Sequence, residues 1–313
     1  MLSRIAESLY WVGRYVERAE DTARILDVHV HLILEDPAVD EAATCRMLLD
    51  AMGVPAPPED LDAITATHLL TSDPANVSSI IGCLTAAREN ARSSREILSS
   101  EMWECLNATY HAIPAHSAWA AGEGPHAFFT WVKERAAIVA GLADSTMTRD
   151  DAWRFLALGR SLERMDMTAR LLWACFGDPR TSTDWVTTLR SCSAQEAFLR
   201  TYRRGPDASL VAEFLLLDRL FPRSALSALV VAEHCLAELD PRAGRTGVEQ
   251  EARRILGRAR NHLEYAQVDE LLGDLPAHLR SLQAAGAEAG AAIARRFFSH
   301  TAVEWNLETA VGP

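Results

Sequence analysis

One feature restricts the fold of this chain more than any other. From residue 5 to residue 33 an apolar residue recurs at alternating steps of four and three, without interruption. This spacing places a single apolar seam along an α-helix, because one helical turn takes about 3.6 residues. The seam consists of Ile5, Leu9, Val12, Val16, Ala19, Ala23, Leu26, Val30 and Ile33. Since proline cannot continue the hydrogen-bond ladder, we predict one long helix that ends before Pro37.

The same pattern occurs a second time. Residues 155–172 (FLALGRSLERMDMTARLL) repeat residues 9–26 (LYWVGRYVERAEDTARIL) at a shift of 146, and eight of the last fourteen positions are identical. A weaker similarity pairs Ser79 with Ser224. We interpret this as a tandem duplication within one domain, 1–313, with repeats at about 1–146 and 147–300 and a short C-terminal tail. We expect the two halves to pack about a pseudo-twofold axis.

Helical spacing also dominates the rest of the chain, and segments rich in proline and glycine separate the helices. No segment alternates convincingly between apolar and polar residues, so we predict an all-α, internally duplicated helical bundle without a sheet. After the first helix, the expected helices cover roughly 40–52, 59–70, 77–108, 126–143, 149–175, 185–202, 208–218, 223–239, 248–264 and 268–299.

Composition and charge argue against several classes of protein. The net charge is −12, whereas a nucleic-acid partner requires clustered lysine and arginine. The N-terminus lacks the apolar core of a signal peptide, and no stretch of about eighteen apolar residues could cross a membrane. The six cysteines form no CxxC pair, which favours reduced core thiols. We therefore expect a cytoplasmic protein without a membrane or nucleic-acid partner.

The first helix also carries a charged stripe, formed by Arg14, Glu17, Arg18 and Asp21 at spacings of three, four and seven. Attractive pairs three apart and repulsive pairs four apart nearly cancel, so the stripe needs partners on another element. Because the helix is apolar on several sides, we expect these charges to be at least partly buried and therefore paired.

Three interpretations of the two charged stripes remain open. The first is a buried network in which Glu17 binds Arg164 and Glu163 binds Arg18 across the pseudo-axis. The second is an anion-binding or catalytic cleft, with the arginines as bidentate donors and Glu17 or Glu163 as acid or base. The third is an exposed stripe that binds a partner.

A second charged face lies within residues 87–107. Arg88, Arg92, Arg95 and Ser99 recur at helical spacing, with Glu89 beside them. This face either binds an anionic group or is an arginine face that is solvated or paired with acidic residues. The corresponding part of the second half, VVAEHCLAEL, has no such arginines.

The sequence offers little support for a cofactor or a metal. It contains no GxGxxG, GxxxxGK[ST] or HExxH motif. His29 and His31 point to nearly opposite sides of a helix, and the one Glu-x-x-His spacing, Glu123 to His126, lies in a segment of glycine and proline. We therefore expect neither a cofactor nor a metal site.

These features together resemble the alpha-E domain family, an all-helical bacterial family named for its ER motif. The resemblance rests on GRYVER and GRSLER, each followed by TAR, on ARENARSSREILSSEMWECLN and on LDRLFPRSALSAL, and it spans nearly the whole chain. One departure is Val77, where the family pattern would have proline. The positions carried over are Glu17, Arg18, Glu163, Arg164, Arg88, Glu89, Asn90, Trp103, Pro222, Arg223 and Ser224.

The resemblance implies a context rather than an activity. Such proteins accompany a circularly permuted ATP-grasp ligase and transglutaminase-like proteins. It therefore implies a non-catalytic or co-catalytic partner of an ATP-grasp-type amide or peptide ligase that binds the ligase or its peptide substrate. The alternatives are a stand-alone enzyme, with Glu17 or Glu163 as acid or base, and a purely structural scaffold. The candidate binding residues are Arg14, Arg18, Arg160, Arg164, Arg88, Glu89, Asn90, Arg92, Arg95 and Arg223.

Overall fold

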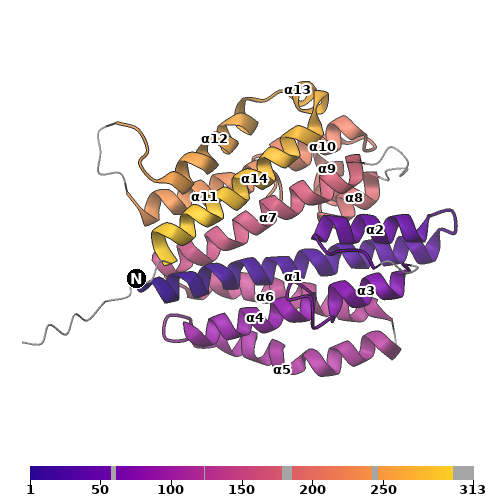
Figure 1. Cartoon of the computed structure of the whole chain (residues 1–313), viewed down its shortest axis with the longest axis horizontal. Coiled ribbons are helices and arrows are strands. Elements are labelled where there is room, and N and C mark those ends of the chain that lie inside the picture. The colour runs from indigo at the N-terminus through magenta and orange to yellow at the C-terminus, as the bar shows by residue number, and fades with distance from the viewer. Residues whose placement is uncertain (58–60, 123, 178–184, 242–245, 299–313) are drawn as a thin grey trace, which may run out of the picture.

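The computed structural model describes residues 1–57, 61–122, 124–177, 185–241 and 246–298 (Figure 1). Over these ranges the chain forms fourteen α-helices and one π-helical turn, and no strand, which confirms the all-α prediction. The elements are α1 (Ser3–Glu35), α2 (Glu41–Met52), α3 (Ala63–Thr71), α4 (Ile80–Ser93), α5 (Ser100–Gly122), α6 (Pro125–Thr146), α7 (Asp151–Gly177), α8 (Trp185–Ser191), α9 (Gln195–Tyr202), α10 (Ala208–Leu217), α11 (Ala225–Leu239), α12 (Glu251–Tyr265), α13 (Val268–Gly273), α14 (Leu275–Ile293) and η1 (Ala294–Phe298).

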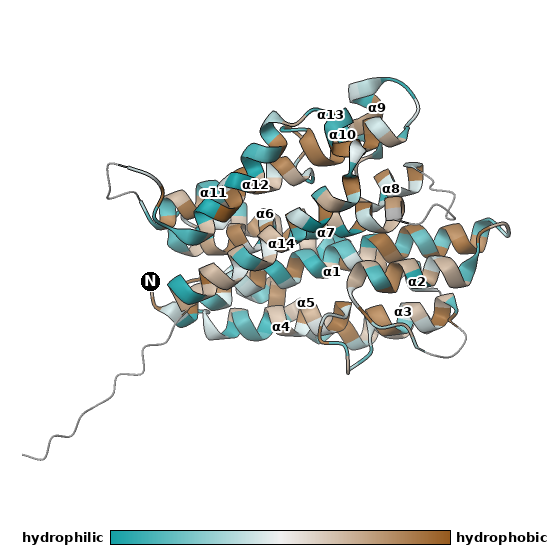
Figure 2. Cartoon of the chain, turned by 45° about the horizontal axis from the view of Figure 1, so that its top comes forward, coloured by the Kyte–Doolittle hydropathy of each residue, from teal (hydrophilic) through white to brown (hydrophobic). Residues whose placement is uncertain are grey.

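Helix α1 runs through the middle of the bundle (Figure 1). It packs against α4 and α6 on one side and against α7 on the other, and η1 reaches its N-terminal part. Every residue of the predicted seam is buried except Ile33, which is partly buried. Both hydrophobic and hydrophilic residues occur along the length of α1 (Figure 2), as expected for a helix that carries both a core seam and a charged stripe.

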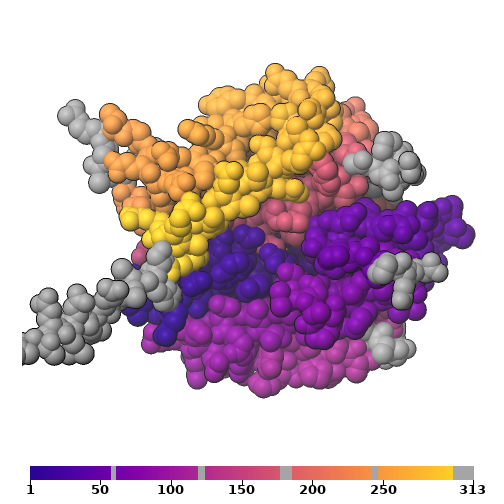
Figure 3. Space-filling model, viewed as in Figure 1, coloured from indigo at the N-terminus to yellow at the C-terminus, as the bar shows by residue number. Residues whose placement is uncertain are grey.

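Helix α7 holds the corresponding position in the rest of the chain. It packs against α1, α11 and α14, and its apolar seam from Phe155 to Leu172 is buried. Figure 3 shows α14 lying diagonally across the face of the molecule, with α1 visible between it and the helices of the first half. The core of both parts of the chain is one continuous apolar cluster.

Three predicted helices are interrupted in the structure. The helix expected at 77–108 is two helices, because Ser99 accepts a hydrogen bond from the Met102 amide and starts α5 anew. Residues 185–202 divide at Ser193, whose φ of 54° is left-handed. Residues 268–299 divide at Asp274, which caps α14 through the Ala277 amide. Capping by Ser99 and Asp274, and the left-handed backbone of Ser193, thus override the apolar periodicity.

One predicted loop is helical. The segment 113–126 was expected to separate two helices because of its proline and glycines, yet α5 continues through Pro114 to Gly122. Helix α6 then begins at Pro125, where the missing amide donor costs nothing, so His126 is helical. Glu123, which has the Glu-x-x-His spacing to His126, lies outside the described residues.

No helix among the described residues is both long and apolar enough to cross a membrane. Five of the six cysteines, Cys45, Cys83, Cys105, Cys192 and Cys235, are buried and form no disulfide, as predicted. Burial in apolar surroundings raises the pKa of the Cys45 thiol to about 11 and that of Cys83 to about 12. These thiols therefore stay protonated at neutral pH and fill the core.

Candidate functional site

The charged stripes of α1 and α7 meet where the two helices cross. A Cβ atom on Gly13 would lie 2.1 Å from the carbonyl oxygen of Leu156, and a Cβ atom on Gly159 would lie 2.0 Å from the carbonyl oxygen of Tyr10. Only glycine permits this approach, and the contact is reciprocal. Because the two backbones touch here, long side chains one turn further along can reach the opposite helix.

The first group of charges, here called the Glu163 cluster, consists of Glu163, Arg14, Arg18, Tyr10 and Ser78. Arg18 donates from Nε to Glu163 Oε1 at 2.6 Å and from Nη2 to Oε2 at 3.0 Å. Arg14 donates its Nε–H to Glu163 Oε2 and binds the Tyr10 hydroxyl at 3.1 Å. Glu163 is 0% exposed, so its carboxylate is closed off by two guanidinium groups.

The second group, the Glu17 cluster, consists of Glu17, Glu20, Asp21, Arg164 and Arg223. Arg164 binds Glu17 with two hydrogen bonds, Nε to Oε1 at 2.6 Å and Nη2 to Oε2 at 2.9 Å. Arg223, which lies between α10 and α11, adds a bond to Glu17 Oε1 at 3.1 Å. The same guanidinium donates to Asp21 and Glu20.

The pairs predicted for a buried network, Glu17 with Arg164 and Glu163 with Arg18, are both present. The two groups nevertheless differ in their third partner. Ser78, which accepts a hydrogen bond from Arg18 at 3.0 Å, aligns in sequence with Arg223. Each cluster thus holds two arginines, but the second arginine of the Glu17 cluster is Arg223, and this cluster adds the carboxylates of Glu20 and Asp21.

The electrostatics keep both glutamates ionised. Burial by itself raises the pKa of Glu163, but the charges and hydrogen bonds of Arg14 and Arg18 outweigh it and hold the pKa below its usual range. Burial also raises the pKa of Glu17, but the charges of Arg164 and Arg223 outweigh this effect and lower the pKa of Glu17 below its usual range. A carboxylate with a lowered pKa and its oxygens already bonded is a poor general base at neutral pH.

Asp21 behaves differently from the two glutamates. Burial and the neighbouring charges of Glu17 and Glu20 outweigh the attraction of Arg223 and raise its pKa to about 7. Glu17, Glu20 and Asp21 share the single positive charge of Arg223. These three carboxylates together therefore retain a proton more readily than one carboxylate paired with one arginine would.

A recess of about 400 Å³ adjoins the Glu163 cluster between α1, α7 and α14. Arg14 and Arg170 both line it, as do the rings of Tyr10 and Trp11. Both arginines are already paired, Arg14 with Glu163 and Arg170 with Asp166 at 2.8 Å. The recess is therefore lined by arginine, as the catalytic interpretation requires, but Arg14 lies between it and the buried carboxylate.

Arg160, the sequence counterpart of Arg14, does not repeat its role. Its Nη2 lies 3.7 Å from Asp144 Oδ1, and its charge contributes to the lowered pKa of Glu17 from a distance. The structure therefore brings four of the predicted arginines, Arg14, Arg18, Arg164 and Arg223, onto the two glutamates and directs Arg160 elsewhere.

The predicted arginine ladder of the first half lies apart from these clusters. Arg88 donates to Asn107 Oδ1 at 3.1 Å and to Glu89, and its guanidinium lies 5.5 Å from the centre of the Trp103 ring. Arg95 lies 5.3 Å from the same ring. Since α4 ends at Ser93, Arg95 belongs to the turn that follows, and the continuous helical ladder predicted from spacing was wrong.

The other two residues of this face differ in exposure. Arg92 pairs with Glu89 at 2.8 Å, and its side chain is 63% exposed. The Asn90 amide donates to the Ala86 carbonyl at 2.8 Å and thus serves its own helix. Arg92, Arg95 and Glu89 therefore offer charge to solvent, whereas Arg88 and Asn90 hold the local structure.

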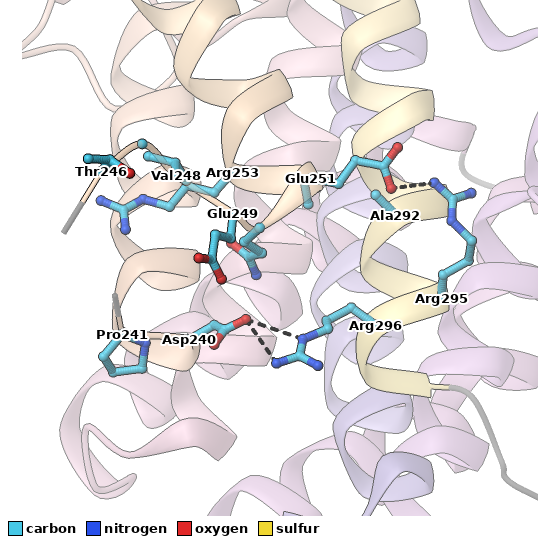
Figure 4. A pocket seen from close by; sticks show the side chains of 13 residues that line it. Asp240, Pro241, Thr246, Val248, Glu249, Glu251, Arg253, Ala292, Arg295 and Arg296 are labelled. Atoms are coloured by element: carbon cyan, nitrogen blue, oxygen red, sulfur yellow. Dashed lines mark hydrogen bonds and ion pairs between the residues drawn. The ribbon is translucent and has the colours of Figure 1, made fainter. Parts of the chain in front are cut away.

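A second cavity, of about 570 Å³, lies between the start of α12 and the end of α14 (Figure 4). Four of its charged side chains form two pairs: Arg295 binds Glu251 at 2.9 Å, and Arg296 binds Asp240 at 3.2 Å. None of the predicted site residues lines it.

Sequence reasoning missed three members of the clusters, Tyr10, Ser78 and Glu20. Glu20 stands three residues after Glu17 and four before Arg24, with which it pairs at 2.6 Å; this spacing was a readable signal. Tyr10 stands four residues before Arg14 on the same helix, so the contact of its hydroxyl with Arg14 could also have been read from spacing.

Comparison with known proteins supports the assignment of the chain to a family. Residues 1–298 match the family described as "Alpha-E: A predicted alpha-helical domain with a conserved ER motif". Uncharacterized proteins of Mycobacterium bovis and of two strains of Mycobacterium tuberculosis are 25% identical over 278 residues, which is 80% of this chain and 31% of each relative. The chain thus spans about a third of the length of these relatives. No solved structure matches.

Proposed function

Because this chain belongs to the Alpha-E family, we propose that it is a non-catalytic or co-catalytic helical partner of an ATP-grasp-type amide or peptide ligase. One observation carries the choice of a partner over an enzyme. Both candidate catalytic carboxylates, Glu17 and Glu163, are buried and bonded to arginine. A general acid or base must reach the proton it transfers, and neither carboxylate offers an oxygen for that purpose.

The role of a partner has two further supports. The matched region occupies 31% of each longer mycobacterial relative, as expected for a helical unit that works beside other domains. The chain also presents charged groups at its surface, among them Arg92 and Arg95, which are exposed to solvent. A ligase that forms an acyl phosphate needs the intermediate shielded from water, and a helical partner closing over that site would provide the shield.

We further propose that the halves at about 1–146 and 147–300 descend from one duplicated unit. The reciprocal glycine contacts of Gly13 and Gly159 support this, since each glycine meets the other helix at the equivalent place. So do Ser79 and Ser224, which each cap the helix that follows them, α4 and α11. Each of these helices packs against its own long helix, α4 on α1 and α11 on α7.

The test is co-expression of this chain with a circularly permuted ATP-grasp ligase from the same organism. We expect the two proteins to co-elute in size exclusion and the ligase to turn over ATP faster in the presence of this chain. A transglutaminase-like protein from the same organism is the second partner to test in the same way. A ligase that neither co-elutes with this chain nor changes its rate would contradict the proposal.

Charge reversal locates the interface. The double variant Arg92→Glu with Arg95→Glu should abolish co-elution, because both side chains are exposed and lie on one surface of the first half. Arg219→Glu is the matched control: its side chain is 70% exposed but belongs to the second half. Equal loss with both variants would show that the effect is not specific to the first-half face.

In the alternative, the chain is itself an enzyme, and the recess beside Arg14 is its substrate pocket. If the chain were an enzyme, purified protein alone would turn over an amide or peptide substrate. Glu17→Gln would then abolish turnover while co-elution with the ligase persisted. Unfolding midpoints of the same samples separate this result from simple loss of fold.

A further inference from the structure

A third polar cluster lies away from both glutamate clusters, where the first turn of α6 meets the C-terminal part of α1. Asp27 and His31 share one face of α1, four residues apart, and His126 is the second residue of α6. One ligand atom from each of the three side chains lies within 4.8 Å of the others. We propose that Asp27, His31 and His126 bind a divalent transition-metal ion, of which Zn²⁺ and Co²⁺ are the probes.

The three groups converge on a single carboxylate oxygen. His126 Nδ1 lies 2.6 Å from Asp27 Oδ1, and His31 Nδ1 lies 3.6 Å from the same oxygen. The two imidazole rings meet edge to face with their centres 4.9 Å apart. Ligands that share one ion at about 2.0–2.2 Å stand roughly 3–3.6 Å from one another. The His31 distance fits this range, and His126 must withdraw slightly from Asp27 to admit the ion.

The exposure of the three side chains suits a site that loads from solvent. The Asp27 side chain is 11% exposed, whereas His31 and His126 are 42% and 60% exposed. The Asp27 carboxylate is thus largely buried, and both imidazoles lie between it and the solvent. Metal ions can therefore enter without unfolding of either helix.

Two neighbouring contacts orient the ligands. His31 Nδ1 lies 3.0 Å from the Asp27 carbonyl oxygen, which holds the ring beside the carboxylate until Nδ1 exchanges this hydrogen bond for the ion. Lys133 donates from Nζ to Asp27 Oδ2 at 2.6 Å and leaves Oδ1 to the ion. The ammonium charge also opposes a cation, so we expect weaker binding than at a closed structural zinc site.

Two imidazoles and one carboxylate form a donor set suited to zinc, cobalt and similar ions. Three protein ligands leave at least one coordination position to water. An ion bound here would join α1 to α6, which otherwise meet in this place through the Asp27 contacts with His126 and Lys133. This inference does not rest on the proposed ligase partnership.

This site was not predicted from the sequence, because His31 was considered only together with His29 in the short run HVH, whose two imidazoles point to nearly opposite sides of the helix. His29 is buried, and its Nδ1 lies 2.9 Å from the Ile25 carbonyl oxygen on another side of the helix. His126 lies 95 positions beyond His31 in the chain. Only the packing of α6 on α1 brings the three ligands together.

The experiment uses the full chain, stripped with a chelator and titrated with Zn²⁺ by calorimetry. In parallel, Co²⁺ is added and its visible absorption is recorded, since cobalt held by two imidazoles and a carboxylate absorbs far more strongly than the aquo ion. We expect one bound ion per chain, strong cobalt bands and a higher thermal midpoint with Zn²⁺. His126→Ala should weaken Zn²⁺ binding at least about tenfold, because loss of a group that merely orients a ligand already costs about 10–100-fold.

A second histidine pair provides the matched control. His262 Nε2 and His278 Nδ1 lie 3.0 Å apart on exposed side chains and could themselves attract zinc. His278→Ala should leave the affinity and the cobalt bands unchanged. His126 is mainly exposed, so its removal should preserve the metal-free thermal midpoint. Unchanged affinity in His126→Ala, or loss of binding in His278→Ala instead, would overturn the proposal.

Discussion

At the scale of single residues, Glu17 and Glu163 show how charge is accommodated inside this bundle. Each is buried, yet each receives hydrogen bonds from two arginines that come from other parts of the chain. A buried charge without a partner costs several kcal/mol, so the glutamates and arginines depend on one another. Removal of either partner therefore affects stability more than removal of a surface pair would.

Replacement of Glu163 measures this dependence. Glu163→Gln leaves Arg14 and Arg18 buried without a counter-charge, and we expect the free energy of unfolding at pH 7 to fall by about 3–5 kcal/mol. Urea denaturation followed by circular dichroism measures the change. The control is Glu264→Gln, which removes an exposed pair with Arg219 and should cost less than about 1 kcal/mol. Equal effects of the two variants would contradict burial of the cluster.

Asp21 predicts a dependence of stability on pH. Its pKa of about 7 in the folded protein lies above the usual value near 3.9, so folding takes up a proton between these values. The stability that this proton brings is complete below about pH 4 and is lost as the pH rises through about 7. Asp21→Asn keeps the group neutral at every pH.

We therefore expect Asp21→Asn to raise the unfolding midpoint in urea more at pH 8 than at pH 5, and to change it little below about pH 4. The comparison of variant with parent at each pH cancels the contribution of other titrating groups. A variant that is less stable than the parent at pH 8 would show that Asp21 is needed there as a charged partner of Arg223.

At the scale of elements, the crossing of α1 and α7 is set by two glycines. Gly13 meets the Leu156 carbonyl and Gly159 meets the Tyr10 carbonyl, so both helix backbones are in direct contact. The close approach allows the guanidinium groups of Arg18 and Arg164 to reach across to the opposite helix. Helix separation and ion pairing are therefore coupled in this structure.

Gly13→Ala tests that coupling. Its new Cβ atom would lie 2.1 Å from the Leu156 oxygen, so the helices must separate, and we expect a loss of about 1–3 kcal/mol or more in the free energy of unfolding. Gly141→Ala, in α6, has no atom within 4 Å of the added carbon and should stabilise the protein by about 1 kcal/mol. Denaturation of both variants in urea measures the difference; a stabilising Gly13→Ala would refute the close crossing.

At the scale of the whole molecule, the two parts of the chain share one core. Helix α1 belongs to the first half of the sequence but packs against α7, α8 and η1 of the second, and α2 also contacts α7. The apolar side chains of both parts belong to a single cluster. Neither half can therefore expose its long helix to water without exposing the partner helix of the other.

This shared core predicts cooperative unfolding of the full chain. Tryptophan fluorescence, which reports on Trp11 and Trp131 in one half and Trp153 and Trp173 in the other, should follow the same urea transition as circular dichroism. Glu163→Gln should shift both transitions equally, because its cluster joins the halves. Two separate transitions would indicate halves that fold independently.

Much of the fold could be read from the sequence, because its strongest signals are local. The seams of α1 and α7 depend on spacing along one helix, and their residues are buried as predicted. Helix ends were read less well: Ser99 and Asp274 restart helices through single hydrogen bonds that apolar periodicity does not register. The two glutamate–arginine pairs were predicted because the repeated motif supplied both partners and the burial of the helix required pairing.

The sequence by itself determined that this chain is helical, that two long helices form its core, and that their charges must be paired. Only the tertiary structure decided that Arg223 joins Glu17 and Asp21, that Arg160 turns to Asp144, and that His126 meets Asp27 and His31. The physical reason is range. The periodicity of a sequence relates residues that lie about one turn apart on the same helix. These contacts instead join residues that come close only once separate helices have packed.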